Sequence, residues 1–220
     1  MMRELLKKSL NICFLLILAS CSASAPIIRE SKWKITIVQD KDDNSIYEKL
    51  SLFLNCYDDD GENDIETIFF IDDDNGLYWE LDDSSWDIKY IDEVRWLGSS
   101  SIVMPDRSNI PRVAIRTLVR DLAGESTEDT IYITKSYTDF EKIVFPELVI
   151  NDGFYSIYNY EHGLIQVVAD GQIILEDEIT NTPETFEIIF NKNREDFNNE
   201  LEFYLTVNDG DLDIISGPWY

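Results

Sequence analysis

The chain has 220 residues and a formal net charge of −26 at pH 7, with 44 acidic residues against 18 lysines and arginines. Such a charge repels phosphate backbones, so nucleic acid is excluded as a partner. The acidic surface suits cations or basic partner proteins, the alternative being that it serves only solubility. A hydrophobic content of 44% and an aromatic content of 12% are enough for a packed core, so the chain is expected to fold.

The N-terminus has the features of a secretory signal. Basic residues at positions 3–8 precede an apolar run at 12–18, and this run is too short to span a bilayer. No later apolar run approaches membrane-spanning length. Any attachment of the mature protein to a membrane is therefore expected to come through a lipid.

Residues 18–21 read Leu-Ala-Ser-Cys. This pattern resembles the lipobox of bacterial lipoproteins. The resemblance implies that residues 1–20 are a lipoprotein signal peptide and that Cys21 carries the lipid. It also implies a membrane-anchored lipoprotein of the bacterial cell envelope, on the periplasmic or the surface face. The alternatives are an ordinary signal peptide that is cleaved near Ala23 or Ala25, or a buried apolar helix.

The cysteines agree with export. Cys13 leaves with the signal and Cys21 is the lipidation candidate, so Cys56 is the one thiol left and no internal disulfide can form. Cys56 shares the apolar face of an alternating run with Leu50, Leu52 and Leu54. It is therefore predicted to be a small core residue rather than a reactive thiol.

Short alternating runs separated by turns rich in Gly and Asp indicate a first β-sandwich over residues 33–136, after a tether at 21–32. A turn is predicted at 98–100. The predicted strands are 33–39, 50–57, 65–71, 77–81, 86–91, 101–104, 112–121 and 130–134.

Residues 137–145 are expected to be a linker, and a second, smaller β-sandwich is predicted over 146–220. Asp170-Gly171 is a hairpin turn signal. The predicted strands are 147–150, 154–159, 164–169, 172–176, 185–191, 200–207 and 212–216. No stretch after the signal has helical periodicity, so the sequence predicts an all-β protein.

Two segments carry a family resemblance. Residues 55–65 are similar to the strand, acidic turn and strand that open bacterial immunoglobulin-like domains, and residues 119–125 are similar to their closing hairpin, with Glu125 where Asn is usual. The resemblance implies immunoglobulin-like or fibronectin-like sandwiches. The layout of lipobox, acidic β-domains and the ending at 215–220 also resembles spirochaete lipoproteins.

Two acidic turns are candidate calcium sites, because calcium binds clustered carboxylate and carbonyl oxygens. The candidate ligands are Asp58, Asp60, Asp64, Asp72 and Asp74. The EF-hand spacing is absent, since Cys56 or Ile71 would occupy the first ligand position. The strand between the turns separates them by roughly 20 Å, so each turn would need ligands from a neighbouring loop. The alternative is that these aspartates only cap turns.

Aromatic and basic side chains offer two further surfaces. Trp79, Trp86 and Trp96 could stack on a sugar or anchor a protein partner, or they could fill the core. Arg112, Arg116 and a third arginine at position 120 alternate with apolar residues on one predicted strand. They are expected to pair with acids on the neighbouring strands, the alternative being a docking stripe for an acidic ligand.

No catalytic motif is present: the sequence has no nucleophile elbow, zincin helix or phosphate-binding glycine loop. We therefore expect no enzyme and no cofactor other than calcium. The sequence predicts a lipid-anchored envelope lipoprotein with a non-catalytic binding or spacer role, and a protein or carbohydrate as its ligand. The alternative is a carbohydrate-binding or hydrolytic accessory protein that uses the tryptophans.

Overall fold

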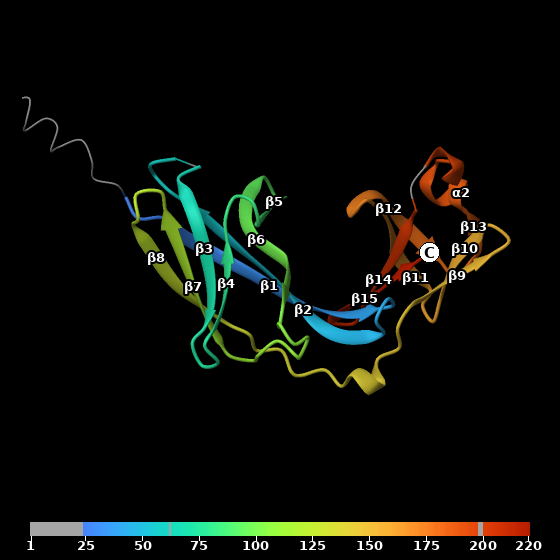
Figure 1. The fold of residues 1–220 in the computed structure, drawn as a ribbon, viewed down its shortest axis with the longest axis horizontal. Helices are drawn as coiled ribbons and strands as arrows, with labels where there is room; N and C mark the ends of the chain where they lie inside the picture. Colours follow the sequence, from blue (N-terminus) through green and yellow to red (C-terminus); the bar gives the residue numbers. More distant parts are fainter. Residues whose placement is uncertain (1–23, 62, 198–199) are drawn as a thin grey trace, which may run out of the picture. The chain divides into compact units, whose positions relative to one another are not determined.

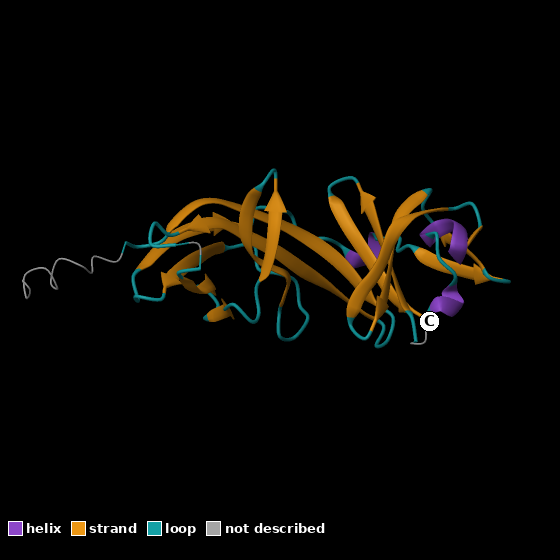
Figure 2. Ribbon diagram, turned by 90° about the horizontal axis from the view of Figure 1, so that it is seen from above, coloured by secondary structure: helices purple, strands orange, loops and turns teal. Residues whose placement is uncertain are grey.

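The computed structural model describes residues 24–61, 63–197 and 200–220, so the predicted signal peptide and Cys21 lie outside the described residues. Within these ranges the chain forms fifteen β-strands, one short α-helix and two 3₁₀ turns, which confirms the predicted all-β class (Figures 1 and 2). None of the described helices is long and apolar enough to cross a membrane.

The described chain divides into two compact units, each built from separate stretches of sequence. Unit 1 contains residues 24–31, 54–98 and 114–132, and unit 2 contains 32–53, 99–113 and 133–220, apart from the residues left undescribed. The units therefore differ from the continuous ranges 33–136 and 146–220 expected from the sequence. The reason is that three long strands belong in part to each unit, namely β1 (Ile27–Asp40), β2 (Ser45–Tyr57) and β6 (Val94–Val103).

Unit 1 contains a four-stranded sheet in the order β4-β3-β7-β8, in which every neighbouring pair is antiparallel (Figure 1). The strands are β3 (Ile65–Asp72), β4 (Leu77–Leu81), β7 (Ala114–Asp121) and β8 (Ser126–Tyr132). Along β7, buried Ile115, Thr117 and Val119 alternate with partly exposed Arg116 and Leu118. This period of two gives the sheet one face in the core and one face in water.

Strands β5 (Asp87–Ile91) and β6 form an antiparallel hairpin, and unit 1 contains all of β5 and the first part of β6. Both strands belong to an eight-stranded sheet in the order β12-β11-β14-β15-β1-β2-β6-β5. Residues 98–100 lie inside β6, so the predicted turn there is wrong. Gly98 and Ser99 are buried in this strand. Small residues are common in turns, but here they fill interior positions of a strand.

Unit 2 holds the C-terminal strands. Two of these strands, at residues 162–169 and 172–180, pair with each other and are joined by the two-residue turn Asp170-Gly171. Both turn residues have positive φ, at 51° and 74°, as the predicted Asp-Gly hairpin requires. The strands are β9 (Glu147–Asn151), β10 (Phe154–Tyr158), β11 (His162–Ala169), β12 (Gln172–Thr180), β13 (Glu184–Thr185), β14 (Glu202–Asp209) and β15 (Leu212–Trp219). Strand β15 runs parallel to the unit 2 part of β1, whereas β9, β10 and β13 form a separate small sheet.

Residues 186–190 form helix α2 (Phe186–Phe190), not the strand predicted at 185–191. Thr185 caps the helix by accepting a hydrogen bond from the Ile188 backbone, and Asn191 ends it in the left-handed conformation. Phe186, Ile189 and Phe190 are buried in the unit 2 core, with the i, i+3, i+4 spacing of a helix face. With only five residues, the helix is too short for its spacing of apolar residues to be distinguished from the alternating pattern of a strand.

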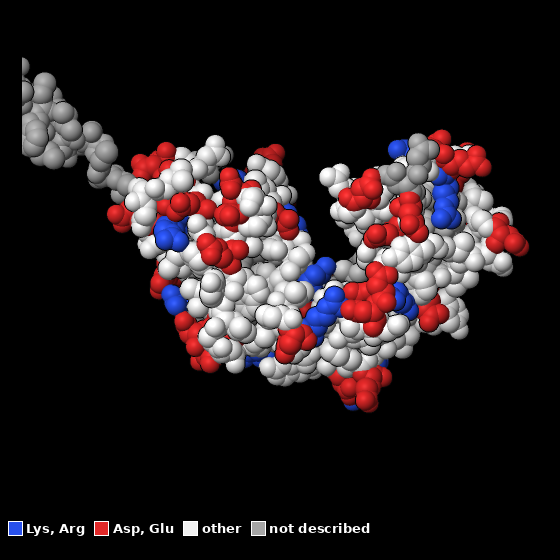
Figure 3. Space-filling model, viewed as in Figure 1, with Lys and Arg blue, Asp and Glu red and all other residues white. Residues whose placement is uncertain are grey.

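The predicted linker at 137–145 forms no strand and contains only a single 3₁₀ turn, η1 (Phe140–Lys142). A second 3₁₀ turn, η2 (Arg194–Asp196), follows α2. The sheets of unit 2 enclose one continuous core that includes Tyr155, Ile165, Phe203 and Leu205. The surface of the described chain is strongly acidic, as the face in Figure 3 shows.

Candidate metal centre

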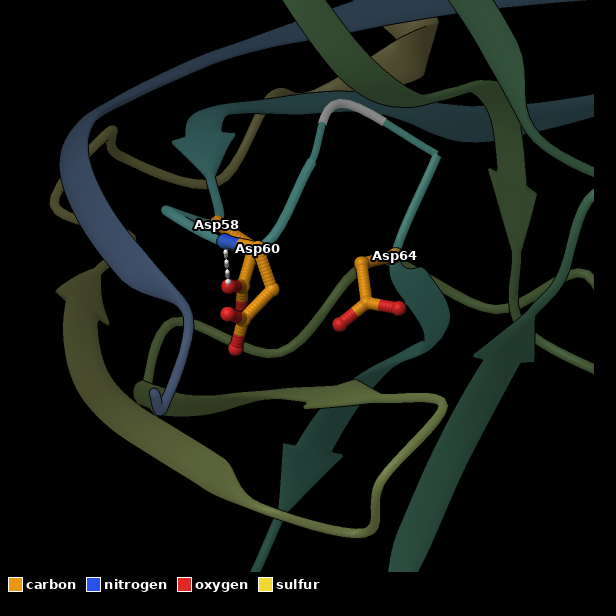
Figure 4. A group of neighbouring side chains, drawn as sticks. All are labelled: Asp58, Asp60 and Asp64. Atoms are coloured by element: carbon orange, nitrogen blue, oxygen red, sulfur yellow. Dashed lines mark hydrogen bonds between the residues drawn. The ribbon is translucent and has the colours of Figure 1, made fainter. Parts of the chain in front are cut away.

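The turn between β2 and β3 brings three of the predicted aspartates together. Asp58 follows the last residue of β2, and its Oδ1 accepts a hydrogen bond from the Asp60 backbone at 2.8 Å, which closes an Asx turn. The Gly61 N–H donates to the Asp58 carbonyl, and the Asp64 N–H donates to the Gly61 carbonyl. These local bonds turn the three carboxylates toward one side of the loop (Figure 4).

One oxygen from each of Asp58, Asp60 and Asp64 lies within 4.8 Å of the corresponding oxygens of the other two. Asp58 is buried, Asp64 is half-buried and Asp60 is exposed, so the group extends from the interior of unit 1 to its surface. The cluster contains only oxygen donors. Such a donor set suits a hard cation such as calcium or magnesium rather than zinc.

A fourth carboxylate, which the sequence interpretation did not select, comes from the hairpin between β7 and β8. Asp121 is the last residue of β7, lies opposite Ile65 in the sheet and is fully buried. The Leu122 N–H donates to the Asp64 carbonyl at 2.8 Å, which fixes this hairpin against the acidic turn. The Asp121 carboxylate is close enough to Asp64 to influence its ionisation.

The pKa of Asp64 is raised above its ordinary value of 3.8. Partial desolvation is the largest cause, and the negative charges of Asp58, Asp121 and Asp60 add to it. Each of these three neighbouring carboxylates therefore disfavours the ionised form of Asp64.

Two carboxylate oxygens of this group are buried without a hydrogen-bond partner among the described residues, Asp58 Oδ2 and Asp121 Oδ2. Asp58 is 5% exposed and Asp121 is 0% exposed. The other oxygen of each is used locally, since Asp121 Oδ1 accepts from the Glu125 backbone at 2.8 Å and Asp58 Oδ1 accepts from Asp60. A buried oxygen that carries charge and lacks a donor is costly unless something else compensates it.

The segment that leads into β1 also reaches this turn. The Ser24 backbone donates to Asp60 Oδ2 at 2.7 Å, and its hydroxyl lies 3.1 Å from both Asp58 Oδ1 and the same Asp60 oxygen. These contacts orient the exposed carboxylate of Asp60.

The second acidic turn is built differently. Asp72 is fully buried, but its Oδ1 accepts from the backbones of Asp74 and Asn75 and its Oδ2 accepts from the Asn75 side chain. The exposed Asp73 pairs with Arg116. Strand β3 separates this turn from Asp64 by about 25 Å, so Asp72 and Asp74 cannot contribute to the first turn. Asp72 has the geometry of a turn cap.

The three predicted tryptophans have different environments. Trp96 is only 2% exposed, so it belongs to the core, whereas Trp79 and Trp86 are half-buried. Trp86 lines a pocket of about 530 Å³ in unit 1, together with Glu80, Asp82 and Arg95. The remaining lining residues are Asn63, Ile65, Glu66, Thr67, Asp83 and Leu122.

The arginines pair internally, as predicted. Arg116 contacts Asp73 and Glu128, and Arg120 lies 3.9 Å from Glu66. Arg112 precedes β7 instead of lying on its face, and it forms an ion pair with Glu48. The expected burial of Cys56 is also confirmed, and this burial raises the pKa of its thiol to about 12.

Sequence reasoning missed Asp121 as part of the cluster, although the hairpin residues 119–125 were singled out for their shape. The available signal was a single aspartate at a strand end, which is common in turns. No model of a protein family, no curated protein and no solved structure matches the chain.

Proposed function

We propose that the chain is a lipid-anchored lipoprotein of the bacterial cell envelope with a non-catalytic binding role. The lipobox-like residues 18–21 support the anchor, and immunoglobulin-like sandwiches would carry the binding surface outward. The antiparallel sheet β4-β3-β7-β8 of unit 1 is the kind of sheet that such sandwiches contain.

The pocket beside Trp86 is the observation that carries the binding role. A protein that acted only as a spacer would not need a recess of about 530 Å³ that combines an aromatic ring with ionised groups. Four carboxylates line it, from Glu66, Glu80, Asp82 and Asp83, against the single cation of Arg95. This balance of charge favours a basic partner, so the proposed ligand is a lysine- or arginine-bearing segment of another envelope protein.

A carbohydrate is the second candidate, and Trp86 is the observation that favours it. A tryptophan face can stack on a sugar ring while carboxylates accept hydrogen bonds from its hydroxyls. Hydrogen bonds from Ser84 and Ser85 lower the pKa of Asp82, which suits this residue to accept hydrogen bonds from a ligand and not to act as a general acid. A glycosidase needs one carboxyl group with a raised pKa as its general acid.

The anchor is tested by labelling cells with a radioactive fatty acid. The wild-type protein should carry the label and remain in the membrane fraction, whereas Cys21→Ala should lose both properties. Equal labelling of the two proteins would contradict the anchor.

The pocket is tested by titrating the purified protein with basic peptides and with neutral oligosaccharides. Trp86→Ala should abolish binding of either ligand. Tyr90→Ala, which removes an aromatic ring that is 69% exposed and does not line the pocket, should leave binding unchanged. Binding that weakens steeply with salt identifies the basic peptide as the ligand, and salt-insensitive binding identifies the sugar. Binding that survives Trp86→Ala would refute the role of the pocket.

A further inference from the structure

We propose that Asp58, Asp60, Asp64 and Asp121 bind one calcium ion in unit 1. The site would join the β2–β3 turn to the β7–β8 hairpin, and none of its four aspartates lines the Trp86 pocket. Asp58, Asp60 and Asp64 each bring one oxygen within 4.8 Å of the other two, and the sheet register places the buried Asp121 opposite Ile65, next to this group. All of these donors are oxygens.

The two unpartnered oxygens distinguish this cluster from an ordinary acidic turn. The chain supplies its own comparison in Asp72, which is equally buried in an aspartate-rich turn and has a donor on both oxygens. Asp58 Oδ2 and Asp121 Oδ2 are buried and have none among the described residues. A turn cap explains Asp72 completely, but it leaves one oxygen unexplained on each of the other two residues. A bound cation would satisfy both oxygens.

The spacing of the oxygens fits a calcium ion. Calcium binds oxygens at about 2.3–2.6 Å, so two ligands on opposite sides of the ion lie up to roughly 5 Å apart. The oxygens of Asp58, Asp60 and Asp64 lie within 4.8 Å of one another and so fall inside this limit. Four carboxylates, some of them bidentate, with water at the exposed Asp60 side, can supply the six to eight oxygens that calcium takes.

Electrostatic repulsion within the cluster adds a reason for a cation. Asp58, Asp60 and Asp64 each bring one oxygen within 4.8 Å of the other two, and like charges at this distance repel one another. A divalent cation would turn this repulsion into attraction, and it would hold the two loops together. Binding should therefore raise the melting temperature of the protein.

The first test is a calorimetric titration of the purified protein with calcium after removal of metals by a chelator. We expect one ion per chain and a melting temperature that is higher in millimolar calcium than in chelator. Magnesium should bind more weakly, because it needs a tighter octahedral arrangement. The absence of calcium binding at millimolar concentration, or tighter binding of magnesium than of calcium, would overturn the proposal. This test needs no variant.

The second test uses a matched pair of substitutions. Asp121→Asn keeps an oxygen that can accept from the Glu125 backbone but removes one charge, so it should weaken calcium binding by at least about tenfold. Asp74→Asn makes the same change on an exposed residue of the other acidic turn and should change the affinity by less than about twofold. Melting curves in chelator check that both variants fold. Equal calcium affinity of Asp121→Asn and the wild-type protein would overturn the site. If Asp121→Asn does not fold, Asp64→Asn takes its place, and it should weaken calcium binding by the same factor.

Discussion

Removing one partner of the buried ion pair between Glu48 and Arg112 should strongly destabilise unit 2. Glu48 lies on β2 with 0% exposure, and the Arg112 side chain is 9% exposed. Glu48 accepts hydrogen bonds at 2.7 and 2.8 Å from the two terminal nitrogens of the guanidinium and at 2.9 Å from the Ile110 backbone. The guanidinium also donates to the Lys135 carbonyl and lies 4.6 Å from the ring of Tyr137. The pair thus connects three segments that are distant in sequence.

Glu48→Gln should destabilise the protein by about 3 kcal/mol, the lower end of the range for removing one partner of a buried pair. The new side chain has nearly the same shape, but its NH₂ group faces the donors of Arg112, and the arginine charge loses its counter-ion. The cost stays at the lower end because Arg112 keeps its bonds to the backbone carbonyls of Lys135 and Ile110. At about 2–4 °C per kcal/mol for a chain of this size, the melting temperature should fall by about 6–12 °C.

The assay is thermal and urea unfolding followed by circular dichroism, with Asp73→Asn as the control. Asp73 also pairs with an arginine, Arg116, but the pair is exposed to solvent and should contribute little to stability. We expect a much larger loss of stability for Glu48→Gln than for Asp73→Asn. Equal losses would show that burial gives the Glu48–Arg112 pair no special weight, and the argument from its geometry would be wrong.

Three further changes test the packing. Because burial raises the pKa of the Cys56 thiol to about 12, iodoacetamide at pH 8 should leave Cys56 unmodified in the native protein and should alkylate it in urea, as peptide mass spectrometry would show. Rapid labelling of Cys56 in the native protein would contradict the burial. Trp96→Ala should lower the free energy of unfolding in urea by about 3–5 kcal/mol, and the same change at the half-buried Trp86 should lower it by less. A larger loss for Trp86→Ala than for Trp96→Ala would contradict the placement of the two side chains. A Cβ atom added at Gly163 would lie 2.8 Å from Ile157 Cδ1 and 3.2 Å from the Thr206 carbonyl oxygen. Gly163→Ala should therefore lower the melting temperature, and an unchanged melting temperature would show that these neighbours can move aside.

Much of the fold could be predicted from the sequence, because strands and hairpins depend on residues that are neighbours in the chain. The alternation of Leu50, Leu52 and Leu54 places them on the buried face of β2, as observed. Asp170-Gly171 determines a two-residue hairpin because both residues accept positive φ. The acidic turn at residues 58–64 follows from local hydrogen bonds in the same way.

Short elements gave the wrong prediction wherever local patterns are ambiguous. Residues 186–190 have too few turns of helix for their spacing to be distinguished from a strand, and the capping bond from Ile188 to Thr185 decides the outcome. Small residues such as those at 98–100 occur both in turns and inside strands. Here Gly98 lies opposite Asp87 of β5, and this pairing places it in a strand.

Other features were decided only by contacts between residues that are distant in sequence. The division of β1, β2 and β6 between two units depends on which strands pair with each part of them, and no local pattern encodes that choice. Asp121 joins the acidic turn because the register of β3 against β7 places it opposite Ile65, the residue that follows Asp64. The sequence by itself identified the acidic turn as a candidate calcium site. Which acids share that site is a matter of sheet register, because register determines which strand ends meet.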